Sequence, residues 1–311
     1  MHKTITILVP AYNEEESIPI LYKRLKKVEK GCGEYRFNYL FVNDGSTDAT
    51  EDVLRAIASM DSAVTAISLS RNFGKEAAML AGLDYATGDA VVIMDADLQH
   101  PPEVIPEFIE KWEEGYNDVY GKRSNRKKDS LLHRLGASVY YTFLQAFVKY
   151  KVYRDIGDFR LIDRRCVEAI REVRESSRST KNIFAWIGFK KTAVSYEVAA
   201  RAAGKSKWNL WKLFGLTLDS LTSFTIAPLS FGIVIGGLLM ILAIAAIPFF
   251  GFINGWVFTS LQMIFAIISF FAGLNLLMIG IMGQYIGRNY IESKNRPPYL
   301  VEDIIGSQED E

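Results

Sequence analysis

The sequence predicts an α/β domain built on a parallel β-sheet, followed by a hairpin of two transmembrane helices. Short apolar segments alternate with amphipathic helical segments between residues 5 and 94. In contrast, no Asp, Glu, Lys, Arg or His occurs from Ser220 through Gly287, although the preceding chain has an ordinary mixture of charges. A cytoplasmic domain followed by a membrane domain accounts for both patterns.

Four apolar strands and three helices make up the predicted sheet domain. The first helix carries its apolar residues on one face, and the third is rich in alanine and leucine and ends at Gly88. This alternation is typical of a parallel sheet with helices on both faces, and sites in such sheets form beyond the carboxyl ends of the strands. The expected strands are residues 5–9, 39–43, 64–68 and 90–94, and the expected helices are residues 17–28, 50–60 and 75–86.

Two later segments have a basic flank and an apolar, aromatic face. The first segment has an apolar helical pattern over residues 131–147, preceded by the basic residues Arg123, Arg126, Lys127 and Lys128. The second, residues 207–225, likewise combines basic residues with an apolar, aromatic face. Helices of this kind lie in the membrane interface, although a core-facing amphipathic helix has the same pattern. We favour the interface for the second segment, because it directly precedes the uncharged region.

Residues 226–250 and 261–286 are each long enough for the ~20 residues that span a bilayer. Basic residues flank the pair on both outer sides, so the positive-inside rule places both ends in the cytoplasm. Gly232, Gly236 and Asn275 could mediate helix contacts, including those of a homo-oligomer. The expected organisation is a cytoplasmic domain (1–206), a juxtamembrane helix (207–225), two transmembrane helices (226–287) and a cytoplasmic tail (288–311).

Composition restricts the function further. Lysine and arginine together number 36, as do aspartate and glutamate, and this balance argues against a nucleic-acid binder. Cys32 and Cys166 form no disulfide framework, which indicates a reducing compartment. The N-terminus resembles a β-strand and not a signal peptide.

Two aspartates end the fourth predicted strand, in the stretch VVIMDADLQHPPE. Asp95 and Asp97 are two residues apart, so in an extended segment their side chains project to the same side. Such a pair can hold Mg²⁺ or Mn²⁺ while substrate phosphates fill other positions, and Gln99 could add an oxygen ligand. The alternative is a pair of loop aspartates of which one caps the next helix.

The first two strand–helix junctions also carry polar residues. The first, VPAYNEEES, lacks the glycine pattern of a dinucleotide site, and no P-loop is present. Its three glutamates fit the first turn of a helix, where the helix dipole favours negative charge. In the second, FVNDGSTDAT, Asp44 could accept a hydrogen bond from a nucleotide base on which Tyr12 stacks, or these residues could serve only as turns and caps.

In combination and order, VPAYNEEE, FVNDGSTD, SRNFGKE and MDADLQHPPE resemble an inverting glycosyltransferase of family 2 over roughly the first 210 residues. GDFRLIDRR, GQYIGRNYIESKNRPPY and the two spans narrow the resemblance to polyprenyl-phosphate glycosyltransferases, including the bactoprenol glucosyltransferase type and dolichyl-phosphate mannose synthases. The resemblance implies a GT-A, Rossmann-like nucleotide-sugar domain. It also implies a bacterial plasma (inner) membrane location with the catalytic domain in the cytoplasm.

The resemblance assigns roles to individual residues. It implies that the nucleotide sugar contacts Pro10, Tyr12, Glu14, Asp44 and Asp95, with Arg201 and Lys207 gripping its phosphates, and that Asp95, Asp97 and Gln99 hold the metal. Beside the resemblance, Asp97 and Asp158 are the candidate catalytic carboxylates, although Asp158 could instead orient Arg160 or a sugar hydroxyl, or only cap a turn. Arg123, Arg126 and Arg160 are the candidate contacts of the acceptor phosphate, and the alternative for the basic stretch that contains Arg123 and Arg126 is a solvated loop.

The expected reaction moves one sugar, with glucose the first choice, from a UDP-sugar to undecaprenyl phosphate. Because a phosphate monoester is largely dianionic near neutral pH, Asp158 need not act as a strong base. N-acetylglucosamine, galactose and mannose remain open as sugars. Two rivals are a short processive polysaccharide synthase, disfavoured by the missing Q-x-x-R-W motif, and a non-catalytic membrane scaffold.

Overall fold

The computed structural model describes residues 2–124, 156–175, 178–197 and 261–306. The chain divides into two compact units, each described here by itself. The first unit comprises residues 1–145, 149–206 and 297–311, and the second comprises residues 146–148 and 207–296. The first unit therefore contains both the N-terminal sheet domain and the end of the chain.

The first half of the sheet matches the sequence prediction. β1 (Lys3–Ala11), β2 (Tyr35–Asn43), β3 (Val64–Leu69) and β4 (Ala90–Ile93) pair in parallel, with β1 between β2 and β4. The intervening helices are α1 (Ser17–Gly31), α2 (Thr50–Met60) and α3 (Lys75–Tyr85). All seven predicted elements are confirmed, since short apolar runs specify the strands and longer apolar or amphipathic segments specify the helices.

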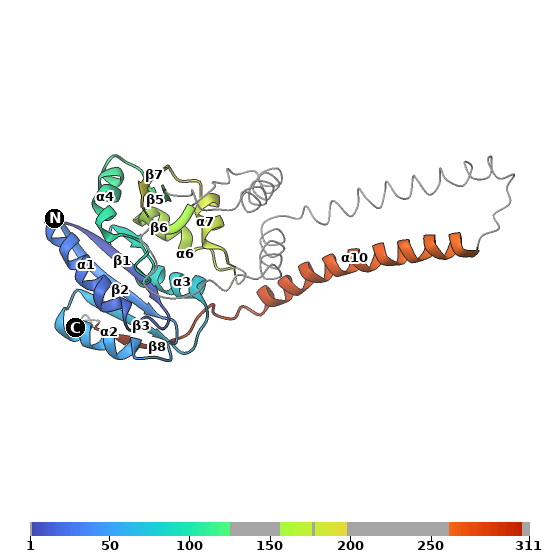
Figure 1. The fold of residues 1–311 in the computed structure, drawn as a ribbon, viewed down its shortest axis with the longest axis horizontal. Helices are drawn as coiled ribbons and strands as arrows, with labels where there is room; N and C mark the ends of the chain where they lie inside the picture. Colours follow the sequence, from blue (N-terminus) through green and yellow to red (C-terminus); the bar gives the residue numbers. More distant parts are fainter. Residues whose placement is uncertain (1, 125–155, 176–177, 198–260, 307–311) are drawn as a thin grey trace. The chain divides into compact units, whose positions relative to one another are not determined.

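The complete sheet is mixed, whereas the sequence predicted parallel strands alone. Its order is β7-β5-β6-β4-β1-β2-β3-β8 (Figure 1). β6 (Ile156–Asp163) runs antiparallel to both β4 and β5 (Asp118–Arg123), and β7 (Lys191–Tyr196) runs parallel to β5. β8 (Val301–Ile305) lies antiparallel to β3, so part of the expected tail forms an edge strand.

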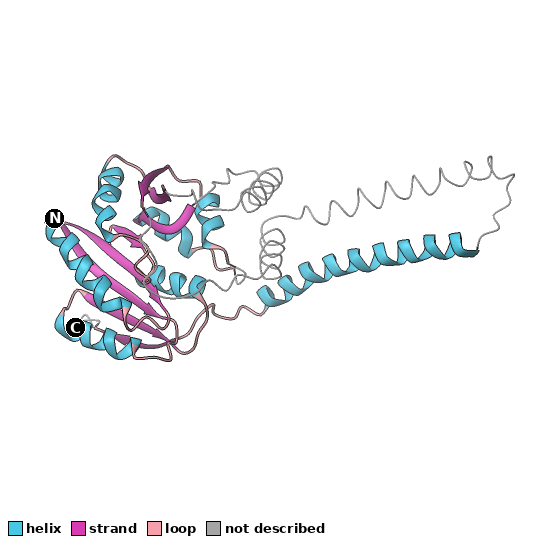
Figure 2. Ribbon diagram, in the orientation of Figure 1, coloured by secondary structure: helices cyan, strands magenta, loops and turns pink. Residues whose placement is uncertain are grey.

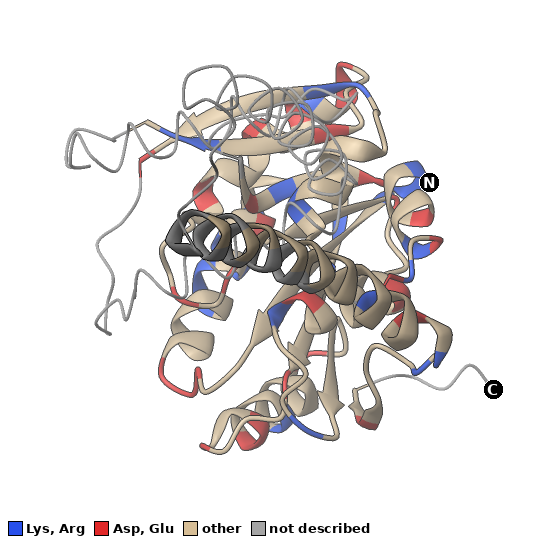
Figure 3. Cartoon of the chain, turned by 90° about the vertical axis from the view of Figure 1, so that its right-hand side faces the viewer, with Lys and Arg blue, Asp and Glu red and all other residues tan. Residues whose placement is uncertain are grey.

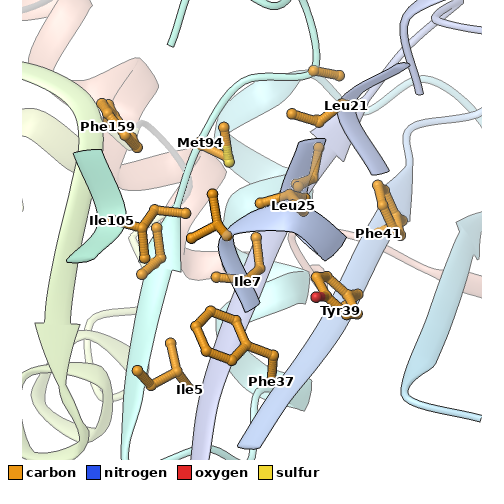
Figure 4. Close-up of a cluster of buried hydrophobic side chains, with 14 of the residues drawn as sticks. Ile5, Ile7, Leu21, Leu25, Phe37, Tyr39, Phe41, Met94, Ile105 and Phe159 are labelled. Atoms are coloured by element: carbon orange, nitrogen blue, oxygen red, sulfur yellow. The ribbon is translucent and has the colours of Figure 1, made fainter. Parts of the chain in front are cut away.

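Helices cover both faces of this sheet (Figure 2). α1, α2 and α4 (Ile105–Glu113) pack on one face and α3, α6 (Arg164–Arg171) and α7 (Thr180–Trp186) on the other. A short 3₁₀ turn, η1 (Pro102–Val104), precedes α4. Figure 4 shows side chains of the first core, in which Ile5, Ile7 and Phe41 pack near Leu21 and Leu25 of α1. Burial on both faces explains why the central strands are apolar throughout.

The described part of the second unit is dominated by α10 (Leu261–Ser293), a helix of 33 residues. It has no charged residue before Arg288, and Figure 3 accordingly draws most of it in tan. Among the residues whose side chains the structure describes, no helix is both long and apolar enough to cross a membrane. The predicted segments 131–147, 207–225 and 226–250, with Gly232 and Gly236, lie outside the described residues.

Candidate active site

A cleft of about 430 Å³ opens at the carboxyl ends of the central strands. Three chain segments that follow β1, β2 and β4 meet there with the start of α3. This is the edge at which open α/β sheets bind ligands, because the strand connections separate there. The cleft is lined by Pro10, Ala11, Tyr12, Glu14, Asp44, Asn72, Gly74, Lys75, Ala78, Asp95, Ala96 and Asp97.

The charge of this cleft is strongly acidic. Glu14, Asp44, Asp95 and Asp97 contribute carboxylates, whereas Lys75 is the only basic residue among those that line it. Burial, together with the repulsion from Asp97, Asp48 and Asp95, raises the pKa of Glu14 despite a hydrogen bond from Ser17. A cleft of this composition attracts cations and, without one, repels a diphosphate.

The loop after β4 holds Asp95 and Asp97 in place. The backbone N–H of Asp95 donates to Nδ1 of His100 at 3.2 Å, and the buried His100 ring stacks on Phe159 with 4.9 Å between centroids. The backbone and side-chain N–H groups of Gln99 donate to the two oxygens of Asp97, at 3.1 and 2.8 Å. Gln99 thus supports Asp97, and its role as a third metal ligand stays a prediction.

Lys75 contacts two carboxylates that come from different parts of the chain, Asp95 after β4 and Asp158 on β6. Its Nζ lies 2.5 Å from Oδ1 of Asp95 and 2.8 Å from Oδ2 of Asp158, although 43% of its side chain is exposed. Burial would lower the pKa of Lys75, but the two carboxylates outweigh it and raise that pKa above its ordinary value. Lys75 therefore stays charged across the physiological pH range.

Asp158 comes from β6, far along the chain from the other acids. Burial alone would raise its pKa, but Lys75 and the more distant Lys181 hold the pKa below its ordinary value. Its Oδ2 accepts from Lys75, while Oδ1 has no hydrogen-bond partner among the described residues. Asp158 is thus an ionised carboxylate whose second oxygen is buried.

Asp44 shapes the wall of the cleft. Its two oxygens accept from the backbone N–H groups of Phe73 and Gly74, at 2.8 and 2.9 Å. Burial raises the pKa of Asp44 even though these hydrogen bonds and Arg71 oppose the rise. The carboxylate expected to contact a base therefore also fixes the loop that begins α3.

The three consecutive glutamates were expected in the first turn of a helix, and that prediction is wrong. α1 begins only at Ser17, because Asn13 adopts a positive φ of 56° and turns the chain before the helix starts. Glu14 instead lines the cleft, and Glu15 accepts from the backbone N–H of Ala49 just before α2. The acids thus connect the first two loops and shape the cleft.

The structure does not support Arg160 as an acceptor-phosphate contact. Its side chain is fully buried, with Nη1 at 3.2 and 3.1 Å from the oxygens of Asp118 and its guanidinium 3.6 Å from the Phe184 ring centroid. Arg160 lies two residues beyond Asp158 on β6 and so shares its face of the sheet, but its guanidinium is directed to Asp118 and to the Phe184 ring. Arg160 therefore belongs to the packing between β5, β6 and α7.

Arg123 ends β5 and is exposed, whereas Arg126, Arg201 and Lys207 lie outside the described residues. Sequence reasoning did not assign a role to Lys75 or His100, although both stand within the motifs that carried the resemblance. Only the tertiary fold brings Asp158 to Lys75, so no local pattern distinguishes this lysine from a solvated one at a helix start.

The oxygen donors of Asp95 and Asp97 suit a hard divalent cation such as Mg²⁺ or Mn²⁺. No group of three or more His, Cys, Asp or Glu side chains arranged for a metal occurs within the described ranges.

Comparison with known proteins identifies the family of the chain. Residues 6–171 match the family model described as Glycosyl transferase family 2. The chain is 41% identical over 308 residues to the prophage bactoprenol glucosyl transferase homolog of Escherichia coli (strain K12), covering 96% of this chain and 99% of that protein. It is 42% identical over 309 residues to the bactoprenol glucosyl transferase of Shigella phage SfV, covering 96% of this chain and 98% of that protein.

Among solved structures, the fold is similar to mannosyl-3-phosphoglycerate synthase from Rubrobacter xylanophilus, with a TM-score of 0.50 and 15% identity. The match covers 70% of this chain and 71% of that one, and it concerns the fold alone. The sheet order, the strand-end cleft and the family match agree on a GT-A domain. The chain therefore belongs to glycosyl transferase family 2 and is a sugar-transferring enzyme.

Proposed function

We propose that this glycosyltransferase moves a single glucose from UDP-glucose to a polyprenyl phosphate such as undecaprenyl phosphate. The observation that carries the proposal is the similarity to proteins named bactoprenol glucosyl transferase, which extends over 96% of the chain. That span includes the uncharged region as well as the GT-A domain. The acidic cleft supplies the donor side of the reaction.

A divalent cation at Asp95 and Asp97 would make the cleft compatible with a nucleotide sugar. The donor brings a diphosphate into a cleft lined by four carboxylates and one lysine. We assign Mg²⁺ or Mn²⁺ to the two aspartates, with Gln99 holding Asp97 in position. When bound, the ion offsets the negative charge of the departing UDP.

The nucleotide is assigned to the loops after β1 and β2. Tyr12 is 44% exposed at the cleft, so its ring is available to stack on the base. Pro10 and Glu14 line the same wall, and Asp44 has the unused lone pairs to accept from a base N–H. Arg201 and Lys207 keep their assignment to the donor phosphates from the sequence.

The chemistry is a single displacement. An oxygen of the lipid phosphate attacks the anomeric carbon, the new carbon–oxygen bond forms as the bond to UDP breaks, and UDP leaves with the electron pair. Attack from the opposite face converts an α-linked donor into a β-linked product. The phosphate dianion, with a second pKa of about 6, needs no strong base.

Asp158 fits a supporting role in this displacement. Its lowered pKa makes it a weak proton acceptor, and its ion pair holds the Lys75 ammonium at the cleft where the donor is proposed to bind. Such contacts position the donor and leave the nucleophile to supply its own charge. Asp158 therefore orients the substrate and does not remove a proton from it.

We assign Arg123 and Arg126 to the acceptor phosphate and place the enzyme in the bacterial inner membrane, with its GT-A domain in the cytoplasm. The uncharged region forms the proposed transmembrane hairpin. The chain leaves the first unit after Ser206 and rejoins it at Pro297. Since β8 pairs with β3 of the same domain, the intervening segment has to cross the bilayer an even number of times.

The experiment is a panel of labelled nucleotide sugars given to the purified full chain with undecaprenyl phosphate and Mn²⁺. We expect UDP-glucose to be used faster than UDP-galactose, UDP-N-acetylglucosamine and GDP-mannose. Preference for another donor would overturn the choice of glucose. UDP binding without any turnover would instead support the non-catalytic scaffold.

A further inference from the structure

We propose that Lys75 is a place-holder cation: it pairs with Asp95 before substrate arrives, and its ammonium would turn to the donor diphosphate when a metal is held by Asp95 and Asp97. This inference rests on the proposed metal role of Asp95 and Asp97. It concerns a residue that had no role in the sequence-based assignment. Its basis is the position of one ammonium between Asp95 and Asp158, at 2.5 and 2.8 Å.

The start of α3 holds Lys75 at the cleft. Lys75 is the first residue of the helix, and Gly74 before it has a positive φ of 97° that favours glycine. Asp44 binds the backbone N–H groups of Phe73 and Gly74 and so fixes the preceding turn. The backbone of Lys75 is thereby anchored, while its four-carbon stem leaves the ammonium able to move.

A metal at Asp95 and the ammonium at its present position would repel each other. The Lys75 Nζ lies within contact distance of Asp95 Oδ1, and two cations on one carboxylate compete for its charge. A bound metal therefore displaces Lys75 from Asp95. The second contact, to Oδ2 of Asp158, keeps the ammonium at the cleft.

The displaced ammonium regains a partner when the donor enters. Before the nucleotide sugar binds, the ammonium contacts two carboxylates with its three N–H groups. The N–H group that leaves Asp95 can then donate a hydrogen bond to a phosphate oxygen of the nucleotide sugar. Metal and diphosphate should consequently bind cooperatively. Each ligand makes the binding free energy of the other more favourable. The metal releases the ammonium from Asp95 so that it can contact the diphosphate, and the diphosphate gives the released ammonium a new partner.

The test measures Mn²⁺ binding to the purified full chain in detergent, with and without UDP. We expect Lys75→Met to bind Mn²⁺ alone about tenfold more tightly than the wild type, since removal of a nearby cation favours another cation at Asp95. The factor by which UDP strengthens Mn²⁺ binding should fall in the variant. Lys111→Met removes an exposed lysine that pairs with Glu114 and should leave both quantities unchanged.

Unchanged or weaker binding of Mn²⁺ alone by Lys75→Met would overturn the inference. A purely structural role would lower the melting temperature of the variant without strengthening metal binding. Lys75→Gln, which keeps hydrogen-bond donors but loses the charge, should show the same direction and serves if Lys75→Met does not fold. Neither measurement needs sugar or lipid, so a failed transfer to polyprenyl phosphate would contradict the proposed function and leave this result standing.

Discussion

The ammonium of Lys75 and the carboxylate of Asp158 form an ion pair at 2.8 Å between the start of α3 and strand β6. The pair thus links the N-terminal part of the sheet domain to a strand that lies about 80 residues further along the chain. Its electrostatic effect is to keep Asp158 ionised, because the ammonium lowers the pKa of that carboxyl. This is the opposite of what a general base near neutral pH requires.

Asp158→Asn should therefore retain substantial turnover. Loss of a general base costs about 10²–10⁴-fold, and we expect a smaller loss than the lower limit of that range. In both the variant and the wild type, kcat should rise with pH through about 6, as the lipid phosphate becomes a dianion. Arg123→Gln should lose more turnover, chiefly through a higher KM for the lipid. Abolished chemistry in Asp158→Asn with both substrates bound would identify Asp158 as the base.

Gln99→Leu should weaken metal binding although Gln99 is not assigned as a ligand. Its backbone and amide N–H groups hold both oxygens of Asp97, and loss of such a supporting contact typically costs about 10–100-fold in metal affinity or activity. Titration of Mn²⁺ into the UDP complex measures the effect. Gln284→Leu, at an exposed position of α10, is the matched control and should bind as the wild type does. If Gln99→Leu bound Mn²⁺ as tightly as Gln284→Leu does, Gln99 would not support the metal site through Asp97.

Arg160→Met should destabilise the fold rather than weaken lipid binding. Among the described residues, the change leaves the buried Asp118 with Lys191 as its remaining ion-pair partner, at 3.7 Å, and breaking a buried pair costs about 3–5 kcal/mol. Arg24→Met, which breaks an exposed pair with Glu103, should cost less than about 1 kcal/mol. Thermal unfolding of the two variants gives the comparison. A normal melting temperature combined with a raised KM for polyprenyl phosphate would restore the acceptor role to Arg160.

The hairpin topology predicts opposite labelling of two introduced cysteines. In a Cys32→Ser background, Asn254→Cys should react with an impermeant thiol reagent added to intact cells. Glu302→Cys, on strand β8, should react only after the membrane is permeabilised. Both results follow if the turn between the spans is outside and β8 remains with the cytoplasmic domain. External labelling of Glu302→Cys would exclude the proposed orientation.

The elements predicted from the sequence are those with strong local patterns. Strands β1–β4 are apolar because both their faces are buried, and helices α1 and α2 show one apolar stripe. The edge strands could not be predicted in the same way. β8 follows a long uncharged segment and alternates exposed with half-buried residues, and only its pairing with β3 gives it a sheet environment.

The residues of the candidate site also fall into those that local motifs predict and those whose contacts only the tertiary fold reveals. Asp95, Asp97 and Asp44 stand at strand ends, so the sequence predicted their shared edge, and the cleft brings them together. The structure does not support the acceptor role of Arg160, because its buried partner Asp118 lies on a separate strand and no local motif reveals that pairing. Lys75 was missed because its partners Asp95 and Asp158 are distant in sequence and meet it only in the folded sheet.

The measurement that most directly tests the central claim is the identity of the product formed from UDP-[¹⁴C]glucose and undecaprenyl phosphate. One sugar on a lipid phosphate should partition into organic solvent, release only glucose on mild acid treatment, and reach a stoichiometry of one glucose per lipid. Asp97→Asn, assayed in parallel, should yield no such product. A water-soluble oligosaccharide, or a lipid that gains several sugars, would contradict single transfer to a polyprenyl phosphate.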